Sequence, residues 1–201
     1  MAGKSLSLND DFALAVRETV TALLASEVVV FPTETVYGVG ARAGDPVAAA
    51  RLRELKGRGE EKPFQLLIAD SGMAENFGAE ISGGARRLAA AFWPGPLTLV
   101  VPRRGGGTLG LRLPDSRFIR AVATGIGGAV AASSANPAGL PPPVDAAGAD
   151  VFGDRVALLV DGGPSPVGKA SSVVQAEGDS FAILREGAIG AELIERAWRS
   201  G

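Results

Sequence analysis

The chain has 201 residues, of which 46% are hydrophobic and 21% charged, and its formal net charge is −2. This length and composition favour one folded domain over residues 1–201, and the near-neutral charge argues against a uniformly basic nucleic-acid-binding protein. Because the chain contains no histidine and no cysteine, histidine-based triads, histidine-ligated zinc, thiolate chemistry and disulfides are all excluded.

The beginning of the chain carries no signal for membrane targeting. The residues from Met1 to Ser5 lack the hydrophobic core of a signal peptide, and no apolar run approaches the ~20 residues that span a bilayer. We therefore expect a cytoplasmic protein without membrane contact.

The first third of the sequence predicts a helix, a strand, a polar loop and a second helix. Asn9 or Asp10 can cap a helix whose apolar residues recur at helical spacing up to Leu24. Residues 28–31 are β-branched and aromatic and predict a buried strand, which Pro32 ends. Hydroxyl-rich and glycine-rich residues 33–40 then read as a loop. Asp45 and Pro46 pair a cap with a proline at the first helical position and predict a helix up to Lys56.

The rest of the chain alternates helical and extended patterns. We expect strands at 64–69, 97–101, 109–113, 129–132, 156–160, 171–175 and 181–185, and helices at 82–92, 116–124 and 191–198. Gly125 is the expected end of the helix at 116–124. This alternation predicts an α/β or α+β fold rather than a helical bundle or a β-sandwich.

Three segments combine side chains that can hold an anionic ligand. The hydroxyls of residues 33–40 follow a strand, where ligands of open α/β sheets settle. Lys56 and Arg58 leave a predicted helix beside flexible glycines, which allows both cations to reach one anion. Ser134 and Asn136 follow another predicted strand. The alternative for the basic pair is a solvated charged surface, and for the serines an ordinary turn.

Together with three further motifs, these segments resemble one family. The motifs are Phe92 to Leu99, Leu111 to Pro114 and Leu184 to Gly187. In this order and spacing, from about Val28 to Gly187, the chain is similar to YrdC-type threonylcarbamoyl-AMP synthases. The resemblance implies a twisted mixed sheet flanked by helices, with a concave, positively lined cavity. It also implies the formation of threonylcarbamoyl-AMP and pyrophosphate from ATP, L-threonine and bicarbonate or CO₂, for the later modification of a tRNA adenosine.

The resemblance also assigns roles to individual residues. It implies catalytic roles for Lys56, Arg58, Ser134 and Asn136; ATP contacts for these four and for Lys62, Thr108 and Arg185; and threonine contacts for Thr33, Thr35, Arg112, Ser171 and Ser172. Mg²⁺ would accompany ATP, and no metal ligands are identified. Glu34 would accept from the substrate ammonium or help to hold a metal. Direct contact with tRNA and with downstream tRNA-modifying proteins is part of the same expectation.

Several alternatives remain open at this point. Leu67 stands where many members of the family carry histidine, which leaves room for a divergent paralogue that binds nucleotide, tRNA or double-stranded RNA with another amino acid or none. A basic RNA-binding module and a serine hydrolase with Ser134 as nucleophile and Lys56 as base are two further hypotheses. Gly163 to Lys169 resembles a phosphate-binding Walker loop, but Ala170 replaces its hydroxyl and a strand, not a helix, is predicted to follow.

Overall fold

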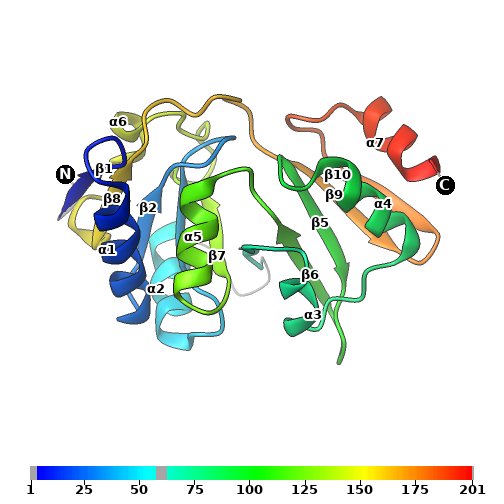
Figure 1. Cartoon of the computed structure of the whole chain (residues 1–201), viewed down its shortest axis with the longest axis horizontal. Helices are drawn as coiled ribbons and strands as arrows, with labels where there is room; N and C mark the ends of the chain where they lie inside the picture. Colours follow the sequence, from blue (N-terminus) through cyan, green and yellow to red (C-terminus); the bar gives the residue numbers. More distant parts are fainter. Residues whose placement is uncertain (1–3, 58–62, 201) are drawn as a thin grey trace.

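A computed structural model describes residues 4–57 and 63–200 of the chain (Figure 1). Within these residues, ten strands form one sheet in the order β1-β8-β2-β3-β7-β4-β6-β5-β9-β10. The strands are β1 (Ser5–Ser7), β2 (Val29–Phe31), β3 (Gly38–Arg42), β4 (Gln65–Leu67), β5 (Leu97–Pro102), β6 (Thr108–Arg112), β7 (Val130–Ser134), β8 (Leu158–Asp161), β9 (Ser172–Glu177) and β10 (Ser180–Arg185). Parallel pairs, such as β2 with β8, and antiparallel pairs, such as β3 with β7, make it a mixed sheet.

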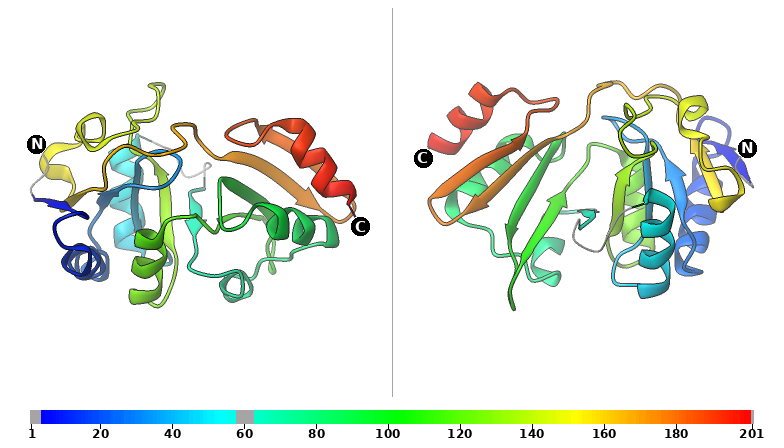
Figure 2. Two further views of the ribbon diagram at one scale, coloured as in Figure 1. Left: turned by 45° about the horizontal axis from the view of Figure 1, so that its top comes forward. Right: turned by 180° about the vertical axis from the view of Figure 1, so that it is seen from behind.

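The helices pack on both faces of this twisted sheet, as Figures 1 and 2 show. They are α1 (Phe12–Leu24), α2 (Pro46–Lys56), α3 (Met73–Asn76), α4 (Gly83–Phe92), α5 (Arg117–Gly125), α6 (Ala146–Ala149), the 3₁₀ turn η1 (Gly153–Arg155) and α7 (Ala191–Arg199). The predicted fold class, a mixed sheet flanked by helices, is confirmed. The assignment of residues 1–201 to one domain stays a prediction.

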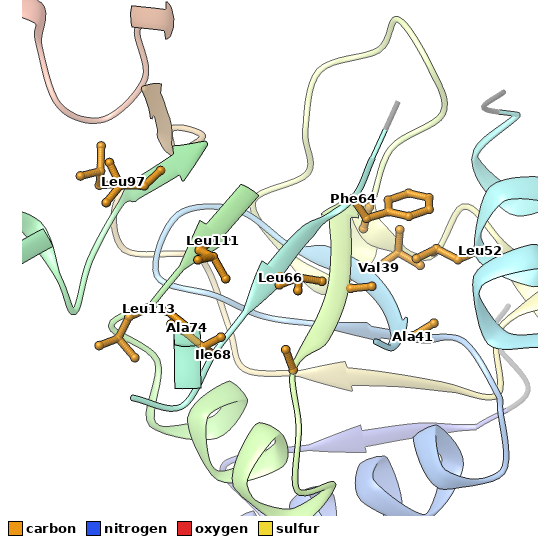
Figure 3. Packing of buried hydrophobic residues seen from close by; sticks show 14 of the residues in the cluster. Val39, Ala41, Leu52, Phe64, Leu66, Ile68, Ala74, Leu97, Leu111 and Leu113 are labelled. Atoms are coloured by element: carbon orange, nitrogen blue, oxygen red, sulfur yellow. The ribbon is translucent and has the colours of Figure 1, made fainter. Parts of the chain in front are cut away.

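Two hydrophobic clusters hold the helices on the sheet. One cluster joins α1 and α5 to β2, β7 and β8, with Phe12 and Phe118 in edge-to-face contact at 6.3 Å. The other joins α2, α4 and α7 to the opposite side, and Figure 3 shows its centre around Leu66, Leu111 and Val39. Burying a leucine or valine side chain stabilises a fold by about 1.5–3 kcal/mol, so these clusters fix the strands that carry the polar side chains described below.

The helix ends differ in detail from the sequence expectations. Asp11, rather than Asn9 or Asp10, caps α1 and accepts from the Leu14 amide. The predicted cap at Asp45 is confirmed, because Oδ1 accepts from two amides of the first turn. α5 ends at Gly125, as predicted, but it is Gly127, with a φ of 60°, that takes the left-handed conformation after the helix.

The segment after Pro32 contains a strand that the sequence did not predict. Gly38 and Gly40 were expected in a loop, but they belong to β3, which pairs with β2 and β7. A Cβ at Gly38 would lie 2.7 Å from the Phe31 ring, and one at Gly40 would lie 2.8 Å from the Ala131 carbonyl oxygen. The glycines are therefore needed for close strand packing and not for loop flexibility.

The connection between β8 and β9 crosses from one end of the sheet to the other. Residues 162–171 run along the top of the view in Figure 1 and join strands that are far apart in the sheet order. No helix follows the Walker-like segment, because Ser172 begins β9, as the sequence predicted. Among the described residues, no helix combines the length and the apolar character that crossing a bilayer requires.

Candidate active site

A cavity of about 220 Å³ opens over the centre of the sheet. Its walls come from β4, β5, β6, β7, β9 and β10 and include Gln65, Thr98, Thr108, Arg112, Ser133, Ser134, Ser171 and Arg185. A second cavity of about 20 Å³ adjoins it and is lined by Thr33, Thr35, Tyr37 and Leu67, among others. Gln65, Arg112, Ser133 and Ser134 line both cavities, so the two form one site with a large and a small part.

The structure brings most of the predicted ligand residues into this site. Thr108, Ser171 and Arg185 line the large cavity, Thr33 and Thr35 line the small one, and Arg112 and Ser134 line both. Two arginines and several hydroxyls on one wall suit an anionic ligand with many acceptor oxygens. The predicted concave cavity with positive lining is present.

Arg112 is held in place by a buried ion pair. It is 3% exposed, and its Nη2 donates to Glu34 Oε1 at 2.7 Å and to Thr35 Oγ1 at 2.9 Å. Its Nε donates to the Gly95 carbonyl at 3.2 Å. Within the described part of the chain, Nη1 makes no hydrogen bond, so it is the nitrogen that Arg112 offers to a ligand. A rigid arginine of this kind fits a carboxylate.

The main contact of Glu34 in this structure is its ion pair with Arg112. Its role as a ligand residue stays a prediction. Its Oε1 accepts from Arg112 and, at 3.0 Å, from the Asp115 amide. Its Oε2 is buried and has no hydrogen-bond partner within the described residues. Glu34 lines neither cavity, so its contact with a substrate ammonium or a metal stays a prediction.

The threonine hydroxyls after Pro32 shape the turn that leads into β3. Thr33 Oγ1 donates to the Val36 carbonyl at 2.7 Å and accepts from the Thr35 and Val36 amides. The hydroxyls of Thr33 and Thr35 lie 2.9 Å apart. Both hydroxyls already have partners in the chain, so a role in ligand binding requires them to exchange or share these hydrogen bonds. Their contact with threonine stays a prediction.

Lys56 is placed differently from the sequence expectation. It was expected to contact ATP or to lie on a solvated charged surface, but it is 3% exposed, and its Nζ donates to the Ser134 carbonyl at 2.8 Å and to the Asn136 carbonyl. Lys56 lines neither cavity. In this structure it therefore fixes the loop after β7.

Asn136 also lies behind the cavity wall. Its Nδ2 donates to the Pro137 and Leu140 carbonyls, and its buried Oδ1 has no hydrogen-bond partner within the described residues. The prediction that Asn136 contacts ATP is not reproduced by the cavity lining. Two other predicted ATP ligands, Arg58 and Lys62, lie outside the described residues.

Ser171, the residue before β9, and Ser172, the first residue of β9, point in opposite directions. Ser171 lines the large cavity, where Arg185 Nη2 donates to its carbonyl at 2.8 Å and to its Oγ at 3.2 Å. Ser172 Oγ instead donates to the Ile189 carbonyl and accepts from the Gly187 and Ile189 amides. Strand alternation turns Ser172 away from the cavity and its hydroxyl is saturated, so its contact with threonine stays a prediction that the cavity lining does not support.

Arg185 and Arg112 influence each other across the cavity. Burial, and secondly the positive charge of Arg112, lower the pKa of the Arg185 guanidinium from its usual value. The Arg185 guanidinium stays charged at neutral pH, since an arginine starts from a very high pKa. A bound anion reduces the repulsion between two positive charges that line one cavity. The proximity of the two arginines therefore supports anion binding between them.

The structure adds two site residues that the sequence analysis missed, Gln65 and Thr98. Thr98 Oγ1 donates to Gln65 Oε1 at 2.7 Å, and both residues line the large cavity. Both lie in predicted strands between apolar residues. Only the alternation of side chains along a strand indicates that they point to the opposite face of the sheet from their apolar neighbours. Gln65 belongs to none of the motifs, and Thr98 lies in the motif from Phe92 to Leu99 without an assigned role.

Tyr37 ties β3 to the segment that crosses the top of the sheet. Its hydroxyl donates to the Gly163 carbonyl at 2.8 Å and accepts from the Gly162 amide at 3.0 Å. Burial is the main reason why the pKa of Tyr37 rises to about 12, and the nearby charge of Asp161 adds to it. An unfolded tyrosine has a pKa of about 10. The stability that neutral Tyr37 contributes is therefore complete below pH 10 and is lost as the pH rises to about 12.

This pH dependence can be measured directly, because Tyr37 is the chain's one tyrosine. A titration of phenolate absorbance in the folded protein should give a midpoint near 12, whereas the chain in denaturant should titrate near 10. Tyr37→Phe, which has no phenolate, supplies the blank. A midpoint near 10 in the folded protein would contradict the buried hydrogen-bonded position.

The described residues offer no ready site for a metal ion. No group of three or more acidic side chains that could hold a metal is found in residues 4–57 and 63–200. Mg²⁺ commonly binds through substrate phosphates with one or two carboxylates.

Comparison with known proteins identifies the family. The Sua5/YciO/YrdC family model, described as "Telomere recombination", matches residues 21–187. A Mycobacterium tuberculosis protein named "Putative threonylcarbamoyl-AMP synthase" is 40% identical over 189 residues, covering 87% of this chain and 85% of that protein. The Bacillus subtilis threonylcarbamoyl-AMP synthase is 37% identical over 202 residues, covering 94% of this chain and 57% of its own length.

A solved structure agrees with these sequence relatives. Sua5 of Pyrococcus abyssi, complexed with L-threonine, superimposes with a TM-score of 0.88 at 31% identity, over 98% of this chain and 60% of that protein. The chain thus spans most of the mycobacterial relative and about three fifths of the longer proteins. The motifs, the sheet and the relatives agree, and the chain belongs to the Sua5/YciO/YrdC family.

Proposed function

We propose that the chain is an L-threonylcarbamoyladenylate synthase, which forms threonylcarbamoyl-AMP and pyrophosphate from ATP, L-threonine and bicarbonate or CO₂. The observation that carries this proposal is the two-part cavity, with a small part beside a fixed arginine and a large part lined by a second arginine and hydroxyls. Relatives that bear this enzyme name cover most of the chain, and a similar structure holds L-threonine.

The chemistry needs positioning more than acid–base groups, which suits a chain without histidine. The threonine ammonium and bicarbonate give a carbamate, one water and one proton. A carbamate oxygen then attacks the α-phosphorus of ATP, and the bond from that phosphorus to the bridging oxygen of the β-phosphate breaks, so that pyrophosphate leaves. No redox step occurs. The protein has to align three small reactants and stabilise the negative charge.

The residues divide between the two parts of the cavity. Arg112 Nη1 binds the threonine carboxylate where the two parts meet, with Thr33 and Thr35 beside it. In the large part, Thr108, Ser134 and Arg185 bind the nucleotide. Lys56 and Asn136 act by holding the loop that carries Ser134. The proposal retains the ATP contacts of Arg58 and Lys62, which lie outside the described residues.

Mg²⁺ is proposed to enter as a complex with ATP. Among the described residues, none of those that line the cavity is acidic, which fits a metal that is bound mainly by phosphate oxygens. When bound, the metal would neutralise charge on the departing pyrophosphate, and Arg185 would contribute positive charge from the protein. Delivery of the adenylate for tRNA modification in the cytoplasm, direct tRNA contact and downstream tRNA-modifying partners belong to the same proposal.

An omission experiment tests this function. Pyrophosphate release should require ATP, Mg²⁺, threonine and bicarbonate together, and mass spectrometry should identify threonylcarbamoyl-AMP. Chelating Mg²⁺ should reduce the rate to background. ATP turnover that is independent of threonine would contradict the amino-acid assignment and would redirect the search to other amino acids for the cavity that contains Leu67.

A further inference from the structure

The side-chain amide of Gln65 lies at the border between the two parts of the cavity. Gln65 extends from β4 and lines both the large and the small cavity, as Arg112 does. Its place between the proposed nucleotide and amino-acid subsites follows from the structure alone, because no sequence motif includes it.

A chain of hydrogen bonds fixes the orientation of this amide. Thr98 Oγ1 donates to Gln65 Oε1 at 2.7 Å and lies 2.9 Å from Ser171 Oγ. A hydroxyl has one proton, so Thr98 must accept from Ser171 while it donates to Gln65. Ser171 Oγ in turn accepts from Arg185 Nη2 at 3.2 Å. All donors in this chain point toward Gln65 Oε1.

This series of hydrogen bonds occupies Gln65 Oε1 and leaves the amide nitrogen, Nε2, for a ligand. With Oε1 occupied, Gln65 Nε2 offers two N–H donors. Among the described residues Nε2 has no hydrogen-bond partner, and it is not one of the buried side-chain atoms without a partner, so it is accessible from the cavity. Arg112 Nη1 is the other open nitrogen at this border.

This inference rests on the proposed function, which requires a carbon dioxide unit to lie between the threonine amine and the α-phosphate. The carbamate that forms there carries one negative charge over two oxygens. One oxygen attacks the phosphorus, and the other needs hydrogen-bond donors that keep the group in line. We propose that Gln65 Nε2 binds the non-attacking carbamate oxygen and the bicarbonate from which it forms, beside Arg112 Nη1, which binds the threonine carboxylate.

The test compares the requirement for bicarbonate with the requirements for threonine and ATP. Gln65→Glu keeps an acceptor for Thr98 but replaces the two donors with a negatively charged oxygen. Loss of a hydrogen bond to a charged group corresponds to about tenfold or more in binding. The half-saturating bicarbonate concentration in pyrophosphate release should therefore rise at least about tenfold, and those of threonine and ATP less than about threefold.

Two further variants complete the experiment. Gln175→Glu makes the same chemical change on β9, outside the lining of both cavities, and should keep the bicarbonate requirement of the unaltered protein. Thr98→Val retains Gln65 but removes the hydrogen bond that orients it, and should raise the bicarbonate requirement by a smaller factor. If Gln65→Glu does not fold, as judged by its thermal unfolding, Thr98→Val decides the question.

The outcomes separate this inference from the function on which it rests. If the unaltered protein needs all three substrates and both cavity variants keep its bicarbonate requirement, only the role of Gln65 is overturned. Equal rises for bicarbonate, threonine and ATP would also overturn it, because they indicate general damage to the site. If the unaltered protein needs neither threonine nor bicarbonate, both the proposed function and this inference fail.

Discussion

Arg112→Ala is expected to destabilise the protein and to remove threonine-dependent activity at the same time. The substitution leaves the buried Glu34 carboxylate without its cation. Breaking a buried ion pair by removing one partner costs about 3–5 kcal/mol in the free energy of unfolding. Loss of Nη1 should lower kcat/KM for threonine by roughly 100-fold, which corresponds to a lost charged hydrogen bond. Urea unfolding and threonine titration of pyrophosphate release measure the two effects.

A double variant separates the two roles of Arg112. Combining Glu34→Gln with Arg112→Met removes both charges, so the free energy of unfolding should recover much of the loss. Activity should not recover, because no cation faces the threonine carboxylate. Full stability in the single Arg112→Ala variant would contradict the importance of the ion pair, and recovered activity in the double variant would contradict the ligand role.

Lys56→Met is expected to impair the use of ATP although Lys56 does not line the cavity. The change removes the ammonium that holds the Ser134 and Asn136 carbonyls. Each charge-assisted hydrogen bond contributes about 1.5–3 kcal/mol, so the loop after β7 should lose its fixed position. We expect kcat/KM for ATP to fall roughly 100-fold, with a smaller change in the KM for threonine. Initial rates at varied ATP and threonine measure both.

The matched control for this substitution is Lys4→Met. Lys4 is an exposed lysine that pairs with Glu18 at the edge of the sheet, so its removal should change kcat/KM for ATP by less than about twofold. Asn136→Ala should act on the same loop, and its effect should not add to that of Lys56→Met. Additive effects, or an unchanged ATP requirement in Lys56→Met, would show that Lys56 does not work through this loop.

Much of the fold could be predicted because its signals are local. Asp45 and Pro46 predict the start of α2, and runs of β-branched residues predict most of the strands. β3 was missed because its glycines resemble loop residues, and the reason for them, the closeness of the Phe31 ring and the Ala131 carbonyl, is a tertiary contact. A local pattern cannot reveal such a contact between strands.

The sequence could predict many of the residues that line the site, but not the direction in which each side chain points. The motifs brought Arg112, Ser134 and Arg185 to one cavity. They did not reveal that Lys56 turns inward or that Ser172 points away, because both depend on which carbonyls and amides meet after folding. Gln65 was missed for a related reason, since its partner Thr98 is 33 positions away and belongs to another strand.

The shortness of β4 has a consequence for the range of ligands that the site can accept. β4 lies between β7 and β6 in the sheet and consists of Gln65–Leu67, while the cavity is lined by strands on both of its sides. A bulkier ligand would have to change the twist between the strands on the β7 side and those on the β6 side of β4. Within the described residues, β4 has three residues over which this change could be distributed. Such a change of twist would therefore fall on β4, which within the described residues pairs with β7 at three positions and with β6 at two.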